Sequence, residues 1–204
     1  MRNQKVVKLA LAGLMAALCF VGYVVFPAIS VSGTKVHVGN AFVVLGALFL
    51  GGVWGGLSGA VGLFLADIVS GYVESSPRTF ITKLVIGLIV GLVAHVIIKI
   101  GQKKKGEAIG WSAVATFAGL GFNCVFEPAL KYVWYTLLFV NPSKSESAIK
   151  ALMAITTWTT LINAGINGAI AVVLYAALRP ALEKAGFDLP GLGKRRHPAA
   201  ETKR

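Results

Sequence analysis

The stretch VHVGNAFVVLGALFLGGVWGGLSGAVGLFLA, residues 36–66, contains no side chain that is formally charged at neutral pH. It is too long for one membrane-crossing helix, which needs about 20 apolar residues. Glycines at positions 51, 52, 55 and 56 surround Trp54, and a glycine cluster between two apolar runs is typical of a tight turn. The stretch therefore predicts two consecutive helices, at about 40–53 and 56–73, that meet at these glycines.

The composition of the whole chain is that of a membrane protein. Of its 204 residues, 56% are hydrophobic and 14% are charged, and its mean hydropathy is +0.75. Soluble globular domains are roughly 45–50% apolar and about 25% charged, and disordered chains are poor in apolar residues. We therefore expect an all-α integral membrane protein, with room for about six spans and none for a second soluble domain.

Six apolar runs contain few or no charged residues. They predict one membrane domain, residues 1–180, with six transmembrane helices. The first run follows three basic residues and lacks a small-x-small cleavage site, so it is expected to be a retained helix rather than a signal peptide. Pro77 stands near the start of the fourth run, where a helix tolerates proline. Glu127-Pro128 interrupts the fifth run, which is expected to be kinked or divided there. The expected spans are 8–29, 40–53, 56–73, 78–99, 109–140 and 151–178.

Basic residues are distributed unevenly around these runs. The net charge is +12, and 14 of the 20 lysines and arginines precede the first span, lie within 99–105 or follow residue 178. Because cytoplasmic loops carry the excess of basic residues, both termini and the Lys103-Lys104-Lys105 loop are expected to be cytoplasmic. Residues 181–204 are expected to form a basic, disordered tail on that side. This asymmetry accounts for the positive charge without nucleic acid as a partner.

Signatures of enzymes and of metal or nucleotide sites are absent from the sequence. There is no GxSxG or HExxH motif, and Gly193-Lys194 lacks the upstream glycine and the following Ser or Thr of a phosphate-binding loop. Cys19 and Cys124 lie within apolar runs, at a spacing that matches neither a zinc site nor a redox pair. We expect a protein that is not an enzyme, has no cofactor and no metal, and cannot drive transport by its own ATP hydrolysis.

Polar residues within the expected spans gather in the outer half of the membrane. An ionisable group at membrane depth costs at least ~2.5–3.5 kcal/mol, so each is expected to face a partner, a cavity or water. Asn123, Glu127 and Lys131 recur every four residues and share one helix face, and Asn163 and Asn167 repeat that spacing on the next span. These stripes predict an outward-facing polar cavity whose candidate substrate-binding residues are His37, Asn40, Asp67, Tyr72, Lys83, Asn123, Glu127, Lys131, Trp158, Asn163 and Asn167.

Simpler interpretations of the same residues remain open. Glu127 and Lys131 have the spacing of an intrahelical ion pair that neutralises itself. Asn163 and Asn167 have the character of amides that bridge neighbouring helices. Aromatic residues near the outer helix ends, Trp158 among them, offer stacking surfaces for a flat ring, but tryptophan and tyrosine also form interfacial belts.

Small residues form a second pattern, on the first three spans. Ala12 and Ala16, together with Gly13 and Ala17, have the small-xxx-small spacing that permits close helix approach. Glycines 52 and 56, and 55 and 59, repeat this spacing. Two interpretations remain open for these faces: packing within the monomer, or a docking surface for another membrane protein.

The segments HVGNAFVVLGALFLGG (37–52), LADIVSGY (65–72) and TFITK (79–83) resemble the substrate-binding S components of energy-coupling factor (ECF) vitamin transporters. The resemblance covers about residues 5–180 and is closest to the riboflavin-type family that includes proteins for pyridoxine and hydroxymethylpyrimidine. It implies a six-helix protein of the bacterial plasma membrane that binds a water-soluble vitamin near its outer surface. It further implies a transmembrane coupling subunit, contacted by the Ala12-xxx-Ala16 face, two ATP-hydrolysing subunits, and membrane lipid around the protein itself.

An aromatic-lined cavity with both acidic and basic groups fits a small heteroaromatic alcohol such as pyridoxine, slightly better than hydroxymethylpyrimidine, riboflavin or pantothenate. Two other classes are weaker interpretations. A self-contained secondary transporter or channel more often shows broken helices in both halves of an internal repeat. A structural membrane subunit without a ligand leaves the outer charged cluster unexplained.

Overall fold

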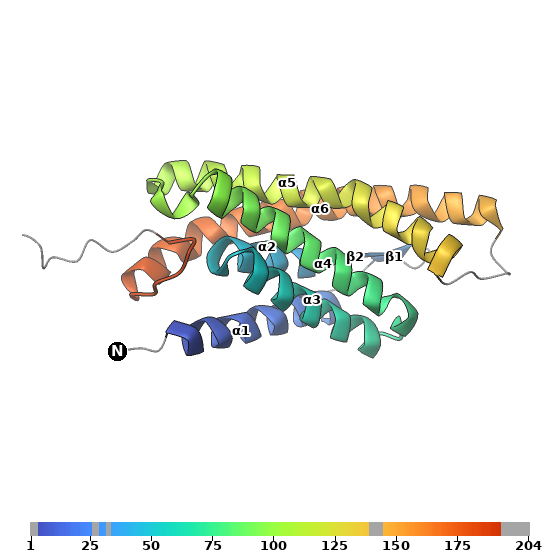
Figure 1. The fold of residues 1–204 in the computed structure, drawn as a ribbon, viewed down its shortest axis with the longest axis horizontal. Helices are drawn as coiled ribbons and strands as arrows, with labels where there is room; N and C mark the ends of the chain where they lie inside the picture. The colour runs from blue at the N-terminus through green and yellow to red at the C-terminus, as the bar shows by residue number, and fades with distance from the viewer. Residues whose placement is uncertain (1–3, 26–28, 32–33, 139–144, 193–204) are drawn as a thin grey trace, which may run out of the picture.

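The computed structural model describes residues 4–25, 29–31, 34–138 and 145–192. These residues form six α-helices that run along one long axis, with a short antiparallel hairpin at one end of the bundle (Figure 1). We call this end, which holds β1, β2 and the turn between α3 and α4, the hairpin end, and the opposite one, where α1 begins, the N-terminal end. The elements are α1 (Gln4–Val24), β1 (Ile29–Val31), β2 (Thr34–Val36), α2 (Gly39–Leu50), α3 (Gly52–Val69), α4 (Ser76–Gly91), α5 (Lys105–Val133) and α6 (Glu146–Lys184).

Short helical turns extend or connect these helices. A 3-10 turn, Val73–Ser75, precedes α4, and a π-helical turn, Leu92–Ile97, continues it. A 3-10 turn, Ile100–Gln102, leads into α5, and a π-helical turn, Trp134–Leu138, extends α5 beyond its last α-helical residue. Pro128 lies inside α5, so this helix is not divided at the Glu127-Pro128 pair.

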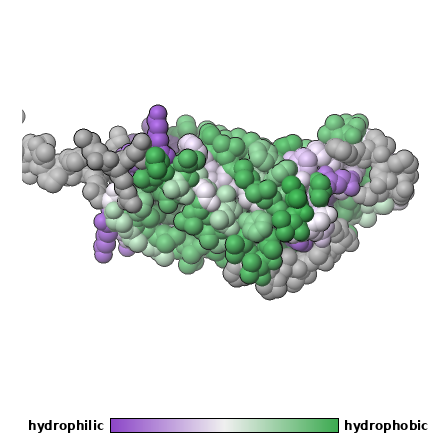
Figure 2. Space-filling view, turned by 90° about the horizontal axis from the view of Figure 1, so that it is seen from below, coloured by the Kyte–Doolittle hydropathy of each residue, from purple (hydrophilic) through white to green (hydrophobic). Residues whose placement is uncertain are grey.

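The expectation of an all-α membrane protein is confirmed. Within the described residues, five helical segments are long and apolar enough to cross a membrane: 4–24, 52–69, 73–97, 105–138 and 146–184. Apolar residues cover the visible face of the bundle between its two ends, and hydrophilic residues gather toward the ends (Figure 2). The sixth helix, α2, has only 12 residues, of which all but Phe42 are buried by the surrounding helices. The count of six spans therefore stays a prediction.

The turn between α2 and α3 consists of Gly51 alone. Its φ of +94° lies in the region that favours glycine. The expected boundaries at residues 53 and 56 are therefore corrected to Leu50 and Gly52. Gly55 lies inside α3, where a Cβ would come within 2.1 Å of the Ala47 backbone nitrogen. The glycine cluster thus supplies the turn between α2 and α3 and a close contact between these two helices.

Glycines also bring α3 and α4 into close contact. A Cβ at Gly87 would lie 2.2 Å from the Cα of Gly56, and one at Gly91 would lie 2.2 Å from the Cα of Gly52. Two pairs of glycines with four-residue spacing therefore face each other across this interface. Lipid offers little hydrophobic drive for helix association, so such close backbone packing holds membrane helices together. These glycines serve packing within the monomer.

The small residues of α1 divide between two faces. Ala12 is buried and Ala16 is half-buried, and a Cβ on Gly62 of α3 would come within 2.2 Å of the Ala16 carbonyl oxygen. Gly13 and Ala17 are exposed, and a Cβ on Gly13 would meet nothing within 4 Å. The Ala12/Ala16 face therefore packs inside the monomer, and the exposed surface available to a partner carries Gly13 and Ala17.

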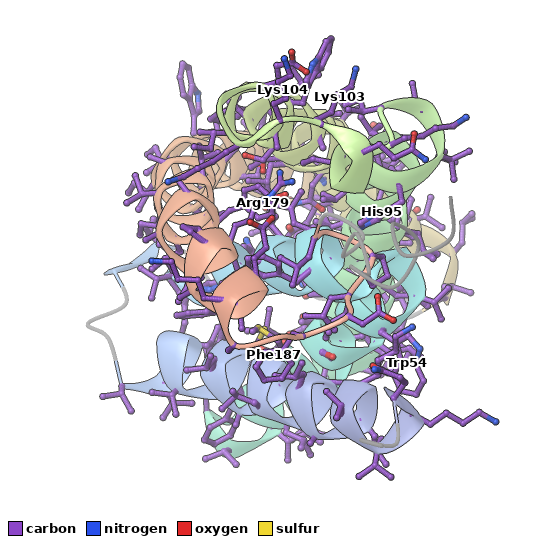
Figure 3. All side chains as sticks on the ribbon, turned by 90° about the vertical axis from the view of Figure 1, so that its left-hand side faces the viewer. Trp54, His95, Lys103, Lys104, Arg179 and Phe187 are labelled. Carbon is purple, nitrogen blue, oxygen red and sulfur yellow. The ribbon has the colours of Figure 1, made fainter. Side chains whose placement is uncertain are left out.

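The C-terminal part of the chain corrects two expectations. Helix α6 continues past Arg179-Pro180 to Lys184, because the buried Arg179 side chain donates hydrogen bonds to Glu183, to the Tyr175 hydroxyl and to the Lys103 carbonyl. Figure 3, which views the N-terminal end of the bundle, shows Arg179 in its interior, with Lys103 and Lys104 at its rim.

Residues 185–192 then pack back onto α2. The Gly191 amide donates to the Phe49 carbonyl, the Tyr175 hydroxyl donates to the Gly191 carbonyl, and Leu189 and Leu192 are buried. The expected disordered tail is therefore wrong for residues 181–192, because this segment has apolar side chains to bury. Residues 193–204, the rest of that expected tail, lie outside the described residues, as does Lys144.

Candidate functional site

A small polar cavity lies at the hairpin end, between β2 and the ends of the surrounding helices. Its volume is about 50 Å³, whereas pockets for drug-sized ligands are roughly 300–1,000 Å³. In this conformation the lining side chains therefore close on one another, and a vitamin-sized ligand requires them to move apart. The lining residues are Tyr23, Lys35, His37, Asn40, Leu63, Asp67, Tyr72, Ser75, Arg78, Thr79, Lys83, Glu127, Lys131 and Asn163.

Asp67, near the end of α3, joins three helices. The Tyr23 hydroxyl of α1 donates to its Oδ1, and the Thr79 hydroxyl of α4 donates to its Oδ2, both at 2.5 Å. The side chain is 5% exposed. Both oxygens of this carboxylate therefore have donors within the protein, which compensates its burial.

Glu127 of α5 pairs with a lysine of a different helix. Its Oε2 lies 3.6 Å from the Lys83 Nζ of α4 and accepts a hydrogen bond of 2.9 Å from the Asn123 side chain. Lys131, one turn further along α5, donates to the Thr156 hydroxyl of α6 at 2.8 Å. The polar stripe on α5 thus holds α4, α5 and α6 together at the cavity.

Asn163 and Asn167 of α6 attach the junction between β2 and α2. The Oδ1 of Asn163 accepts from the His37 amide at 3.0 Å, and its Nδ2 donates to the Lys35 carbonyl at 2.9 Å. The Oδ1 of Asn167 accepts from the Ala41 amide at 2.9 Å, and its Nδ2 donates to the His37 carbonyl at 2.8 Å. These amides satisfy backbone groups of a buried loop, as the bridging interpretation expects, and Asn163 also lines the cavity.

Aromatic rings and the Lys35 side chain line the cavity on its hairpin side. The Lys35 Nζ lies 4.5 Å from the centroid of the Tyr23 ring and 4.7 Å from that of Tyr72. The His37 ring meets Tyr23 edge-on, with centroids 4.7 Å apart. The cavity therefore combines ring faces, lysines and carboxylates within one small volume.

His37, in the loop between β2 and α2, is held neutral. Its Nδ1 accepts a hydrogen bond from the Gly39 amide at 3.1 Å. Burial lowers the pKa of His37 to about 3, and the positive charge of Lys83 acts in the same direction. A neutral imidazole that accepts at Nδ1 carries its proton on Nε2.

Arg78, at the start of α4, is the residue at this site that sequence reasoning missed most clearly. It is 6% exposed, and its guanidinium carbon lies 5.8 Å from the centroid of the Tyr135 ring. Its buried guanidinium nitrogen Nη1 has no hydrogen-bond partner among the described residues. Arg78 and Lys83 are the two basic residues of α4, but side chains five residues apart point in directions about 140° apart on an α-helix, so their spacing gave no signal that both line the cavity. Tyr23, Lys35, Leu63, Ser75 and Thr79 were also missed as lining residues.

Most of the expected binding residues converge at the cavity. His37, Asn40, Asp67, Tyr72, Lys83, Glu127, Lys131 and Asn163 line it. Asn123 and Asn167 lie behind this lining, where they hold Glu127 and the His37 loop. Trp158 is the exception: it is 70% exposed, because it lies on the face of α6 opposite the buried Thr156, Thr160 and Asn163. The structure does not bring Trp158 to the cavity, and its expected stacking role is corrected.

The arrangement suits the binding of a polar solute. Four cationic side chains and two carboxylates line the cavity: Lys35, Arg78, Lys83, Lys131, Asp67 and Glu127. Among the described residues no group of three or more His, Cys, Asp or Glu side chains could hold a metal ion.

A larger cavity, of about 430 Å³, lies at the N-terminal end. Lys8, His95, Lys99 and Asp188 are among the residues that line it. These side chains are half-buried or exposed, and the His95 Nε2 is hydrogen-bonded to the Ala47 carbonyl. The cavity at the hairpin end is smaller, but its charged groups are buried and converge, so it is the better candidate for recognition.

Comparison with known proteins gives one match. Residues 3–180 match the family model described as ECF-type riboflavin transporter, S component. Searches of curated proteins and of solved structures found no match. The family match confirms the resemblance stated from the sequence, whereas the pyridoxine-like subtype stays a prediction.

Proposed function

The chain belongs to the S components of ECF-type riboflavin transporters, and from this membership we propose that it binds its substrate with high affinity for ATP-driven vitamin uptake. As an S component it is a substrate-binding transporter subunit in the membrane rather than an enzyme. The observation that carries the proposal is the convergence of buried charged and aromatic side chains at one end of an otherwise apolar bundle. Ionisable groups buried in membrane proteins are by default candidates for a functional site.

The substrate proposed first is pyridoxine or a related hydroxymethylpyrimidine compound. The rings of Tyr23, Tyr72 and His37 offer apolar and stacking surface for a small heteroaromatic ring. Lysines and carboxylates around them offer partners for hydroxyl groups and a ring nitrogen. The same chemistry accommodates part of riboflavin, the vitamin in the family's description, so riboflavin is the second candidate.

The partners proposed are a transmembrane coupling subunit and two ATP-hydrolysing subunits of an energy-coupling factor module. The cavity faces outward in this proposal, and both termini face the cytoplasm of a bacterial plasma membrane, as the basic residues favour. The exposed Gly13/Ala17 face of α1 supports docking of the coupling subunit there, because small side chains permit close approach of a second helix. The vitamin then passes inward when that module acts on the bundle.

A panel of B vitamins tests this proposal. We expect pyridoxine, hydroxymethylpyrimidine or riboflavin to raise the melting temperature of the purified protein in detergent, since a ligand that binds only the folded state stabilises it by mass action. Isothermal titration calorimetry then ranks the binders. Absence of binding by every vitamin would contradict the proposal. Vitamin accumulation in liposomes that contain this protein alone would instead favour a self-contained secondary transporter.

A further inference from the structure

The side chain of Arg78, at the cavity, carries a buried donor that has no acceptor within the described part of the chain. It is 6% exposed, and its Nη1 is buried without a hydrogen-bond acceptor among the described residues. The Tyr135 ring lies near the guanidinium carbon, at 5.8 Å, but a ring face does not accept the in-plane N–H groups at the edge of a guanidinium. A buried cationic donor without an acceptor is costly to maintain.

Both carboxylates of the cavity already have partners within the protein. Asp67 accepts from Tyr23 and Thr79, and Glu127 accepts from Asn123 and pairs with Lys83. Four cations face these two carboxylates, so the lining of the cavity carries a net positive charge. Among the described residues, the buried Arg78 Nη1 thus has no hydrogen-bond acceptor, and neither carboxylate of the cavity forms an ion pair with Arg78.

We propose that the ligand of this cavity carries a carboxylate or a phosphate group, and that Arg78 binds this group. The inference rests on the proposed function, and it narrows the substrate to an anionic vitamin or an anionic vitamin derivative. Arginine suits this task because its fork of N–H donors matches the two oxygens of a carboxylate or phosphate. Lys83 and Lys131 line the same cavity and add positive charge around the group.

Matched ligand pairs that differ only in the acidic group test the proposal. The pairs are pyridoxine 5′-phosphate and pyridoxine, riboflavin 5′-phosphate and riboflavin, pantothenate and pantothenol, and nicotinate and nicotinamide. Calorimetry on the purified wild-type protein measures the affinity of each member. In the pair that the protein recognises, we expect the anionic member to bind about tenfold tighter or more, as charge-assisted hydrogen bonds to a buried arginine are strong.

Variants at Arg78 assign that preference to the residue. R78Q should remove the preference, because it lowers the affinity for the anionic member more than the affinity for its neutral partner, and R78K should retain part of the preference. K150Q is the matched control: Lys150 is an exposed base at the same end of the protein, paired with Glu146 and absent from the cavity. It should bind both members as the wild type does.

The outcomes separate this inference from the proposed function. If a neutral vitamin binds the wild type as tightly as its anionic partner does, the inference is wrong and the proposed function stands. This comparison needs no variant, so it holds even if R78Q fails to fold. An anion preference that persists in R78Q would contradict the role of Arg78. Binding of no member of any pair and of no vitamin in the B-vitamin panel would contradict the proposed function itself.

Discussion

His37 links the chemistry of the cavity to the stability of the fold. Its backbone and side chain are tied to Asn163, Asn167 and Gly39, and its imidazole accepts a hydrogen bond that requires the neutral form. Protonation of Nδ1 would remove that acceptor and place a positive charge beside Lys83. The residue therefore makes the β2–α2 junction sensitive to acid.

This dependence has a defined sign. A histidine in the unfolded chain titrates near 6.5, whereas the pKa of folded His37 is about 3. Between these values only the unfolded state binds the proton, so stability is fully present above about pH 6.5 and falls as the pH is lowered toward 3. The expected slope is at most about 1.4 kcal/mol per pH unit.

Denaturation of the wild type and of His37→Asn, measured from pH 7.5 to 4 in detergent, checks this prediction. Asparagine retains a side-chain oxygen that can accept from the Gly39 amide but does not titrate. The difference in unfolding free energy between the two proteins should shrink or reverse as the pH falls. A difference that stays constant across this range would show that His37 does not titrate in it.

At the scale of helices, the contact between α3 and α4 depends on glycine. Gly87→Ala places a methyl group 2.2 Å from the Cα of Gly56, so the two helices must separate. Overpacking of this kind costs about 1–3 kcal/mol, and we expect a clearly lower melting temperature.

Gly121→Ala in α5 is the matched control, because its Cβ meets nothing within 4 Å. Since alanine favours helix over glycine by about 1 kcal/mol, the control should melt at the same temperature as the wild type or higher. Equal melting of both variants would contradict the close packing.

Helix α1 offers the surface on which a partner is proposed to dock. Ala17→Trp covers this exposed face with a large side chain, so we expect co-purification with the coupling subunit and ATP-dependent uptake to be lost. Vitamin affinity of the isolated protein should be retained, because Ala17 lies outside the cavity. Val173→Trp on α6 is the control, since Val173 is 65% exposed on another helix. Normal uptake by the Ala17 variant would place the docking surface elsewhere.

The element boundaries show which patterns predict helices well and which do not. Runs with few or no charges predicted all six helices. A segment in an apolar environment has to satisfy its own backbone polar groups, and an α-helix does so within the segment. The runs missed the ends: α1 stops at Val24 and α6 runs on to Lys184. The expected sixth span ends at residue 178, whereas in the structure hydrogen bonds of Arg179 to Glu183 and to the Lys103 carbonyl support the last turn of α6.

At the scale of the whole molecule, orientation in the membrane is the property that remains to be measured. The distribution of basic residues predicts that the hairpin end faces outward. Cysteines introduced at the exposed Lys150 and Lys104 should react with a membrane-impermeant maleimide from opposite sides, Lys150→Cys from outside and Lys104→Cys from inside. The wild type is the control, because Cys19 and Cys124 are both buried. Labelling of the two positions from the same side, or in the reverse order, would overturn the orientation and the outward cavity.

The sequence by itself determined the class of the protein and its helical segments, because these follow from composition and from the distribution of apolar residues along the chain. The family rests instead on the resemblance of segments 37–52, 65–72 and 79–83, which the match over residues 3–180 confirms. The sequence also located eight lining residues of the cavity, since polar and charged side chains at membrane depth are costly and stand out in an apolar sequence. Only the tertiary structure decided which groups pair. In it Glu127 pairs with Lys83, and Asn163 and Asn167 form hydrogen bonds to the β2–α2 junction. Trp158 is exposed, Ala12 is buried within the bundle, and Arg78 lines the cavity. These facts depend on how helices rotate and meet, and contacts between distant segments leave no local pattern in the chain.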